Sequence, residues 1–344
     1  MKSLVYFSFK YLFRYFNYIY FRSVKVYGYE KIPKDGGVLF SPNHQGALLD
    51  PLLVGSMTPR KLTSLTRSDV FGGSFKWFFD ACQMLPVYRI RDGYQNLKKN
   101  DLTFEKCYKI LGNGDFLLMF SEGGHHNEYY LKNLSKGSSR LAFIAHKENP
   151  DKKIYLQPVG INYGHHQQPQ CSLHLVYGSP IEIGALYETE LTDAENINKI
   201  REELQNKMKE CLWLPENTEN YHIQKQKINR ITTELEFDQL KASLNTSFHK
   251  LPNRKKQSAL VRFLAIALSL PNIIPLWITR KVIGKFKDIV FTSSMKYSLG
   301  LFFFPIWWLG TAIPIAYGYG NSIMTIYLLV SILSLFIRQR ILLL

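Results

Sequence analysis

The chain has 344 residues, 46% of them hydrophobic, so it can bury a sizeable core and is long for one ordinary domain. Its formal net charge is +16, from 43 Lys and Arg against 27 Asp and Glu, which indicates an anionic partner such as nucleic acid or anionic lipid. The cysteines have no paired spacing. This argues against a zinc site or a disulfide framework and favours reduced thiols in a protein that faces the cytoplasm.

The N-terminal segment, residues 1–26, is dense in Tyr and Phe and carries cations but no acidic residue. Lys10 and Arg14 interrupt its apolar positions, so it lacks the continuous apolar region of a secretory signal. Aromatic rings interleaved with cations suit the headgroup layer of a bilayer better than its hydrocarbon core. We predict an interfacial membrane helix here, and the alternative is a basic arm that binds nucleic acid.

Residues 27–214 alternate short apolar runs with stretches of helical spacing. This pattern predicts an α/β domain with a mixed, largely parallel sheet flanked by helices. Five runs predict strands: GGVLFSPN, KLTSLTR, FLLMFSE, KIYLQPVGINY and SLHLVYG. Helical spacing occurs at residues 94–111 and 136–147, and most clearly at 192–212, which opens with a Thr-x-x-Glu capping box. In such folds functional sites collect at the ends of the strands.

The C-terminal third changes in composition. A polar stretch, residues 215–258, predicts a solvated helical connector to a membrane region over residues 259–344. Residues 297–317 and 321–337 lack charge and histidine and approach the about 20 apolar residues that cross a bilayer. We therefore predict two transmembrane helices joined by a Gly-Tyr-Gly-Asn turn, with a buried soluble hairpin as the alternative. Prolines split residues 263–279, which predicts a re-entrant or interfacial hairpin.

Basic residues flank the two predicted spans on both sides, so the positive-inside tendency places both ends of the pair in the cytoplasm. A membrane region also gives the net positive charge of the chain a partner. We therefore expect that charge to face a bilayer containing anionic lipids rather than nucleic acid.

The octapeptide NHQGALLD, residues 43–50, places one imidazole, His44, and one carboxylate, Asp50, around a spacer of mostly small and apolar residues. A general base presents one ring nitrogen to a reactive hydroxyl, and a carboxylate on the other nitrogen fixes the tautomer and stabilises the imidazolium. We expect the chain to turn so that Asp50 contacts His44, while Gly46 and Ala47 leave room for a substrate beside the imidazole. A structural histidine is the alternative when this block is taken alone.

Three further blocks follow at the ends of apolar runs. LPVYR ends with Arg89, a cation that can grip a phosphate. FSEGGHHN carries Glu122 and the pair Gly123 and Gly124, whose backbone can approach a ligand closely. LQPVGINY carries Pro158. Each block alone is more often a strand and a turn, so the order of the blocks along the chain is the stronger signal.

That order resembles the glycerolipid acyltransferase family, the PlsC-like membrane enzymes that move a fatty acyl chain from a thioester to a glycerol-phosphate hydroxyl. The resemblance covers roughly residues 30–185. It implies an α/β acyltransferase domain on the cytoplasmic face of a membrane, with no metal and no organic cofactor.

The resemblance also implies roles for the residues that match by position. His44 matches the family's general base and Asp50 its partner carboxylate. Arg89 matches the arginine that holds the acceptor phosphate. Glu122 and Gly123 match the Pro-Glu-Gly block that helps bind the acceptor, and Pro158 matches the proline tied to the acyl pocket.

The chain departs from the family pattern at three places. Five residues separate His44 from Asp50 where four are commonest, a form that resembles the branch of glycerol-3-phosphate and dihydroxyacetone-phosphate acyltransferases. Ser121 replaces the usual proline before the glutamate. His125 and His126 stand where Thr or Ser and then Arg often stand, so a phosphate-gripping cation is missing. Candidates to replace that cation are Lys132, Lys136 and Arg67.

The resemblance implies an integral membrane enzyme of phospholipid biosynthesis, in the inner membrane if the source is bacterial. It would acylate glycerol 3-phosphate or dihydroxyacetone phosphate, with acyl-CoA or acyl-ACP as donor. The nearest alternative is a lysophosphatidate (1-acyl-sn-glycerol-3-phosphate) acyltransferase. A third hypothesis is a membrane lipid-binding protein without turnover, which the altered FSEGGHH block would favour.

Overall fold

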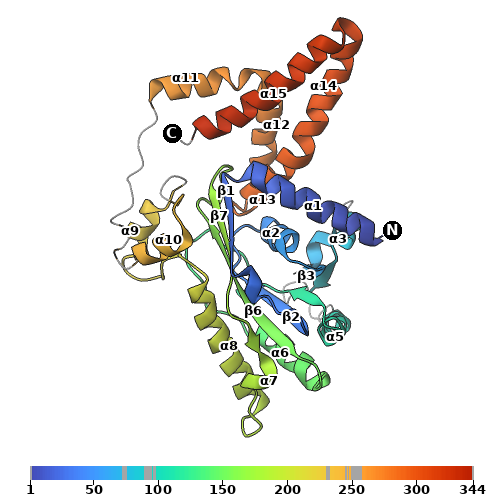
Figure 1. Ribbon diagram of the computed structural model, residues 1–344, viewed down its shortest axis with the longest axis vertical. Helices are drawn as coiled ribbons and strands as arrows, with labels where there is room; N and C mark the ends of the chain where they lie inside the picture. The colour runs from blue at the N-terminus through green and yellow to red at the C-terminus, as the bar shows by residue number, and fades with distance from the viewer. Residues whose placement is uncertain are drawn as a thin grey trace.

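The computed structural model describes residues 2–71, 76–88, 95, 98–229, 233–244, 246, 248 and 258–342. Within these residues an eight-stranded mixed sheet lies at the centre and helices flank it, which confirms the fold class predicted from the sequence (Figure 1). The strands are β1 (Ser23–Tyr27), β2 (Gly37–Pro42), β3 (Leu62–Arg67), β4 (Met84–Val87), β5 (Phe116–Leu118), β6 (Ile154–Tyr163), β7 (Ser172–Tyr177) and β8 (Ile181–Glu182). Each of the five runs predicted as strands contains one of them, although FLLMFSE is extended only over its first three residues.

The order of strands across the sheet is β1-β7-β6-β2-β5-β3-β4, and β8 also pairs with β6. The five strands from β6 to β4 are parallel, whereas β7 and β8 run antiparallel to β6. Strand β1 is parallel to β7. Because β2, β5, β3 and β4 run in the same direction, their carboxyl ends meet at one edge of the sheet. Two of the four sequence blocks, NHQGALLD and FSEGGHHN, begin at that edge.

Two layers of helices cover the two faces of the sheet. On β2, Val38 and Phe40 face a core shared with α1, α2 and α3, whereas Leu39 between them faces a core shared with α5, α6 and α8. This is the two-residue alternation of a strand that is buried on both sides. The helices of these layers are α1 (Lys2–Tyr20), α2 (Leu49–Met57), α3 (Lys76–Ala81), α5 (Lys99–Gly112), α6 (Gly137–Glu148) and α8 (Asp193–Glu210), and a short α7 (Ile183–Leu186) precedes α8.

Helix α8 forms where the sequence predicts its clearest helix. Thr192 caps it and Glu195 returns a bond to the Thr192 backbone, so the predicted capping box is present. Its apolar stripe is buried in the core shared with α5 and α6 and consists of Ile197, Ile200, Leu204 and Met208.

Helix α1 is buried along one stripe and exposed along the other. The buried positions recur every three or four residues and are Tyr6, Lys10, Phe13, Asn17 and Tyr20. The exposed positions are largely apolar and aromatic and include Leu4, Tyr11, Leu12, Tyr15, Tyr18 and Ile19. Such a face is typical of a helix that lies in a membrane interface, and this location stays a prediction. The helix ends at Tyr20, before the predicted limit at residue 26, because residues 23–27 pair with β7 as β1.

Helices α9 (Tyr221–Lys227) and α10 (Phe237–Leu244) pack beside the β1–β7 edge of the sheet. Trp213 and Leu240 are fully buried and share an apolar cluster with Val176 of β7. The polar stretch after residue 214 therefore contributes a small core to the domain in addition to connecting it to the C-terminal helices. Most of residues 245–257 lies outside the described part of the chain.

The C-terminal helices extend away from one end of the sheet, except for α13, which lies beside α1 (Figure 1). They are α11 (Ala259–Ala267), α12 (Ile273–Ile283), α13 (Phe291–Ser298), α14 (Phe304–Tyr319) and α15 (Asn321–Ile341). A π-helical stretch, Leu299–Phe303, joins α13 to α14. The resulting helix Phe291–Tyr319 and α15 are long and apolar enough to cross a membrane. Helix α11 and the helix Leu270–Ile283 are bent by 48° at their junction.

Asn272, at the bend after α11, ties this bent pair to the two long helices. Its side chain is fully buried and donates from Nδ2 to the Ser331 carbonyl at 2.8 Å, while Trp308 Nε1 donates to its Oδ1 at 2.8 Å. Buried amides that bond across helices are a common means of holding helices together where the surroundings are apolar.

Candidate active site

The candidate site lies at the edge of the sheet where the parallel strands end. His44 follows β2, Phe120 follows β5, and Arg67 is the last residue of β3. Arg89 follows β4 in the chain, but it lies outside the described residues, so the structure does not place the predicted phosphate ligand. The edge therefore collects side chains from segments that are far apart in the sequence, as expected for a parallel sheet.

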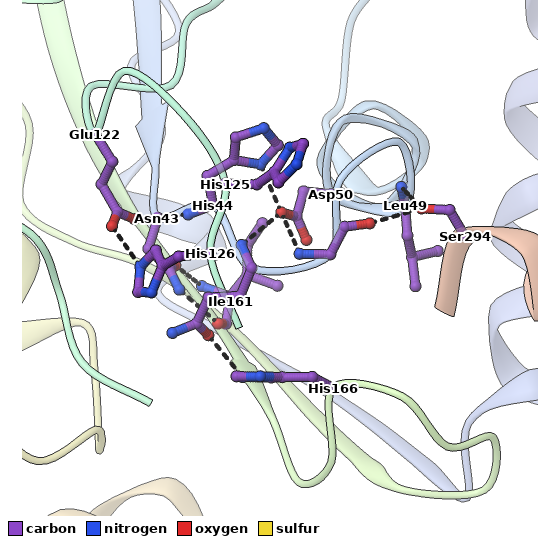
Figure 2. Close-up of polar contacts among 12 residues, drawn as sticks. Asn43, His44, Leu49, Asp50, Glu122, His125, His126, Ile161, His166 and Ser294 are labelled. Carbon is purple, nitrogen blue, oxygen red and sulfur yellow. Dashed lines mark hydrogen bonds and ion pairs between the residues drawn. The ribbon is translucent and has the colours of Figure 1, made fainter. Parts of the chain in front are cut away.

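His44 and Asp50 are in contact, as the spacing in NHQGALLD predicts. His44 Nδ1 lies 2.8 Å from Asp50 Oδ2, and the carboxylate is fully buried, whereas 14% of the imidazole surface is exposed (Figure 2). We assign the Nδ1–H tautomer because the carboxylate is the acceptor of this bond. The lone pair of His44 Nε2 is then free to accept a proton.

The position of Asp50 is fixed by the turn that precedes α2 and by β6. The Gln45 and Gly46 amides donate to Asp50 Oδ2 at 2.9 and 2.8 Å, and the Tyr163 hydroxyl donates to Oδ1 at 2.6 Å. Asp50 lies in the first turn of α2, where the helix dipole favours a negative charge. Three donors besides His44 therefore hold the carboxylate in one orientation.

Gly46 and Ala47, between His44 and Asp50, have structural roles that differ from the one predicted for them. A Cβ atom on Gly46 would lie 2.5 Å from Asp50 Oδ1 and 2.7 Å from the Tyr163 hydroxyl. Glycine is therefore required so that the carboxylate and this hydroxyl can approach the backbone, and the expectation that Gly46 leaves room for a substrate is wrong. Ala47 makes the turn itself, with a φ of 50°, a left-handed conformation that costs an L-residue about 1–2 kcal/mol.

Two rings pack on the imidazole of His44. Phe120 stacks on it with a centroid distance of 3.8 Å, and His125 meets it edge-on at 5.4 Å. His125 Nε2 in turn lies 2.8 Å from Asp288 Oδ2, in the segment that precedes α13. Burial lowers the pKa of His125, and the contact with Asp288 opposes this shift. The imidazole is thus confined between an aromatic ring and a second histidine.

Glu122 faces inward and bonds the backbone of the NHQGALLD block. Its side chain is fully buried, and its Oε1 accepts a hydrogen bond from the His44 amide at 2.7 Å. Its Oε2 accepts from the Lys132 amide at 3.2 Å and lies 2.8 Å from His126 Nε2. His126, which stands where the family often has arginine, therefore has Glu122 as its partner. Direct binding of an acceptor by Glu122, as the resemblance implies, stays a prediction.

The other matched positions fall into two groups. Gly123 has a φ of 71°, and neither it nor Gly124 has a close neighbour where a Cβ would stand, so the backbone of this turn is open to a ligand. Pro158 is buried within β6, in register with Ser41 of β2, and its carbonyl accepts from the Gly178 amide at 3.0 Å. Ser121, which replaces the family's proline, bonds the hydroxyls of Ser41 and Ser138 beneath the site.

Arg67 reaches this edge from β3. It pairs with Asp69, and it is a minor contributor to the lowered pKa of His125. Of the cations proposed to replace the missing arginine, Lys132 contacts Glu122 through its backbone amide. In the described part of the chain, no group of three or more His, Cys, Asp or Glu side chains is placed to hold a metal ion.

Sequence reasoning missed Tyr163, Phe120 and Asp288. Tyr163 of β6 and Phe120 after β5 lie inside quoted blocks, but neither carries a local signal of its contact with Asp50 in α2 or with His44 after β2. Asp288, which contacts His125, belongs to a segment that the sequence predicts entirely as membrane region.

The family described as Acyltransferase matches residues 23–162 of this chain. Among curated proteins, the glycerol-3-phosphate O-acyltransferase 2 of Saccharomyces cerevisiae is 26% identical over 111 residues. An uncharacterised acyltransferase of Schizosaccharomyces pombe is 30% identical over 103 residues. These matches cover 32% and 30% of this chain and 15% of each relative, so the chain matches only a small part of their length. Among solved structures, the 1-acyl-sn-glycerophosphate acyltransferase PlsC of Thermotoga maritima aligns with 61% of this chain and 80% of that one, at 18% identity and a TM-score of 0.46.

Proposed function

Since this chain belongs to the glycerolipid acyltransferase family, we propose that it transfers a fatty acyl group to the hydroxyl of glycerol 3-phosphate or dihydroxyacetone phosphate. The donor would be a thioester, acyl-CoA or acyl-ACP. The observation that supports this proposal most directly is the contact of 2.8 Å between His44 and the buried Asp50 at the carboxyl edge of the sheet.

In the proposed reaction the acceptor hydroxyl attacks the carbonyl carbon of the thioester while His44 Nε2 takes its proton. A carbon–oxygen bond forms, the carbon–sulfur bond breaks, and the imidazolium returns the proton to the departing thiolate. Asp50 stabilises the positive imidazolium through Nδ1, as a carboxylate does in other histidine-based sites. A positioned general base contributes typically 10²–10⁴-fold to such a rate, so His44 would carry much of the chemistry.

Two features favour a small first acceptor. The five-residue spacer between His44 and Asp50 resembles the glycerol-3-phosphate and dihydroxyacetone-phosphate branch, and one of the relatives bears the name of a glycerol-3-phosphate acyltransferase. The acceptor is a phosphate ester, and Arg89, together with Arg67 at the end of β3, would supply positive charge near it. Gly123 and Gly124, which follow Glu122, offer backbone that a ligand could approach.

The experiment is an acceptor panel. Protein purified in detergent receives a labelled acyl donor, as acyl-CoA and as acyl-ACP, with glycerol 3-phosphate, dihydroxyacetone phosphate or lysophosphatidate. We expect transfer to the first two acceptors and a loss of at least about 10²-fold in His44→Ala. The matched control is His222→Ala on the exposed surface of α9, which should leave the rate unchanged.

Each contrary result excludes a defined part of the proposal. Preference for lysophosphatidate would make this chain a 1-acylglycerol-3-phosphate acyltransferase. Full activity in His44→Ala would refute the general-base mechanism. Binding of lipid without transfer to any acceptor would indicate a lipid-binding protein without turnover.

For the membrane region we propose that the helix Phe291–Tyr319 and α15 anchor the enzyme, with α1 lying in the interface on the same side. The cations Lys285, Lys287 and Lys296 precede the uncharged part of the first helix, and Arg338 and Arg340 follow that of the second. By the positive-inside tendency both ends, and with them the catalytic domain, would face the cytoplasm.

A further inference from the structure

Ser294, on α13, forms hydrogen bonds with the loop that joins His44 to Asp50, residues 44–50. Its hydroxyl donates to the Gly46 carbonyl at 2.7 Å and accepts from the Leu49 amide at 3.0 Å (Figure 2). Ser294 is 2% exposed, and 248 positions of the chain separate it from Gly46. One side chain from the C-terminal helices therefore spans the turn between His44 and Asp50.

That turn needs external support. It contains Ala47 in a left-handed conformation, and such backbone strain persists when surrounding contacts determine the conformation. The Leu49 amide, at the start of α2, bonds the Gly46 carbonyl at 3.0 Å and thereby closes the turn. Ser294 bonds both groups of this closing pair, as a second acceptor for the Leu49 amide and as a donor to the Gly46 carbonyl, so it reinforces the segment that carries Asp50.

Helix α13 is itself held firmly against the domain. The Tyr297 hydroxyl donates to Asn17 Oδ1 at 2.7 Å and lies 3.2 Å from the Phe13 carbonyl, both on α1. The Lys296 ammonium donates to the Gln167 carbonyl at 2.8 Å, in the loop after β6. Ser294 thus lies on a helix that is docked on two other segments, and its position is defined independently of the loop it grips.

The same helix continues into the first predicted span. Phe291–Tyr319 has 29 residues, whereas about 20 are needed to cross the hydrocarbon core. The surplus of roughly nine residues is close to the length of α13, so α13 can project from the bilayer while α14 crosses it. Just before it, Asp288 contacts His125, and Phe291 packs edge-on against the same ring at 5.4 Å. This segment therefore forms one wall around His44.

We propose that Ser294 is a positioning residue for acyl transfer: the membrane-proximal end of the C-terminal helix holds the His44–Asp50 loop in its working geometry. Acyl transfer would then require α13 to be docked on the domain. The catalytic role of Ser294 rests on the proposed function, whereas its hydrogen bonds to Gly46 and Leu49 do not depend on it.

The test compares Ser294→Ala with Ser293→Ala. Ser293 is its neighbour on α13 and is 3% exposed, and its hydroxyl has no hydrogen-bond partner within the described residues. The two changes thus remove the same atom at similar burial, but only one of them removes the bonds to Gly46 and Leu49. Hydrogen exchange of the peptide covering residues 44–50, and kcat and KM for the acyl donor, are measured for both variants in the full-length protein.

We expect Ser294→Ala to exchange about two- to tenfold faster over residues 44–50, the effect of losing one net hydrogen bond. We also expect its kcat to fall about tenfold or more with KM within about twofold, because orientation and not donor binding is lost. Ser293→Ala should match the wild type in both. If Ser294→Ala does not fold, Ser294→Cys, which keeps a weaker donor at similar volume, should show the same changes to a smaller degree.

Equal exchange rates in the two alanine variants would refute the claim that Ser294 stabilises the loop of residues 44–50. Faster exchange with unchanged kcat would overturn the positioning role. If the wild type transfers no acyl group to any acceptor, the proposed function fails, and the exchange measurement still decides whether Ser294 holds the loop.

Discussion

Asp50 is the residue whose contacts constrain the site most closely, because its two oxygens accept from four donors on two segments of the chain, residues 44–46 and β6. We expect Asp50→Asn to lower kcat by about 10²–10⁴-fold with little change in folding, since the amide keeps the volume but no longer stabilises an imidazolium. Tyr163→Phe removes one donor and leaves the contact with His44, so its kcat should fall by no more than about tenfold. Equal losses of kcat in Asp50→Asn and Tyr163→Phe would contradict a specific role for the contact between His44 Nδ1 and Asp50.

Gly46 allows a second, steric test of the same geometry. In Gly46→Ala the new methyl group would stand 2.5 Å from Asp50 Oδ1, so the carboxylate has to move. A shift of about 1 Å in a catalytic group can cost about 10²-fold, and we expect a fall in kcat of that order. Ala47→Gly is the control, because glycine adopts the left-handed conformation freely; its activity should be retained and its melting temperature should be equal or higher. An active Gly46→Ala would refute this account of the spacer.

The sequence predicts the contact between His44 and Asp50 but not the residues that hold the pair in place, Tyr163 and Ser294. His44 and Asp50 are close in the chain, and their spacing with glycine between them predicts a turn. Tyr163 and Ser294 reach Asp50 and Gly46 from 113 and 248 positions away. Their side chains follow no local periodicity toward the loop, so only the folded arrangement of β6 and α13 brings them there.

The capping box at the start of α8 is a local sequence signal whose contribution to stability can be measured. The Glu195 carboxylate accepts from the Thr192 hydroxyl at 2.7 Å and from the Thr192 amide at 2.8 Å, and these two bonds lower the pKa of Glu195. The Glu195 amide donates to the threonine hydroxyl in return. We expect Thr192→Ala to reduce the free energy of unfolding by about 1 kcal/mol without changing kcat. Thr189→Ala, in the exposed turn before the helix, is the control. Thermal unfolding of the two variants measures the difference, and an equal melting temperature would show that the cap contributes nothing.

The strands that were predicted and those that were missed differ in burial. β2 and β6 are buried along their whole length, so they read as continuous apolar runs bounded by turn residues. β1 is half-buried at the sheet edge and follows directly on an aromatic helix, so its residues were grouped with that helix. β8 has two residues, too few for any pattern. The order of strands across the sheet depends on pairings between distant segments and has no local signature.

Protonation links the stability of the entire domain to pH. Burial lowers the pKa of His166 to about 3 and, with a smaller contribution from Lys25, that of His174 to about 4. An unfolded histidine titrates near 6.5, so below that pH the unfolded chain binds protons that the folded chain excludes. Stability is therefore complete above about pH 6.5 and declines as the pH falls toward 4, by up to about 1.4 kcal/mol per pH unit for each histidine.

His174→Phe should reduce this acid sensitivity, because phenylalanine keeps the edge-on contact with Tyr27 and takes up no proton. We expect its melting temperature to drop less between pH 7 and pH 5 than that of the wild type. His222→Phe, at an exposed position, should leave the drop unchanged. An identical drop in His174→Phe and the wild type would contradict the claim that protonation of His174 destabilises the domain at low pH.

The length of the helix Phe291–Tyr319 bears on how substrate would be supplied. At about 1.5 Å per residue it spans roughly 43 Å, against about 30 Å of hydrocarbon. Its near end reaches the loop of His44, so the imidazole would lie within a few helical turns of the headgroups. A lipid acceptor or product could then stay in its leaflet throughout the reaction, and encounters would occur by lateral diffusion in two dimensions. The rate should accordingly follow the mole fraction of the lipid in the bilayer and be insensitive to the volume of the surrounding solution.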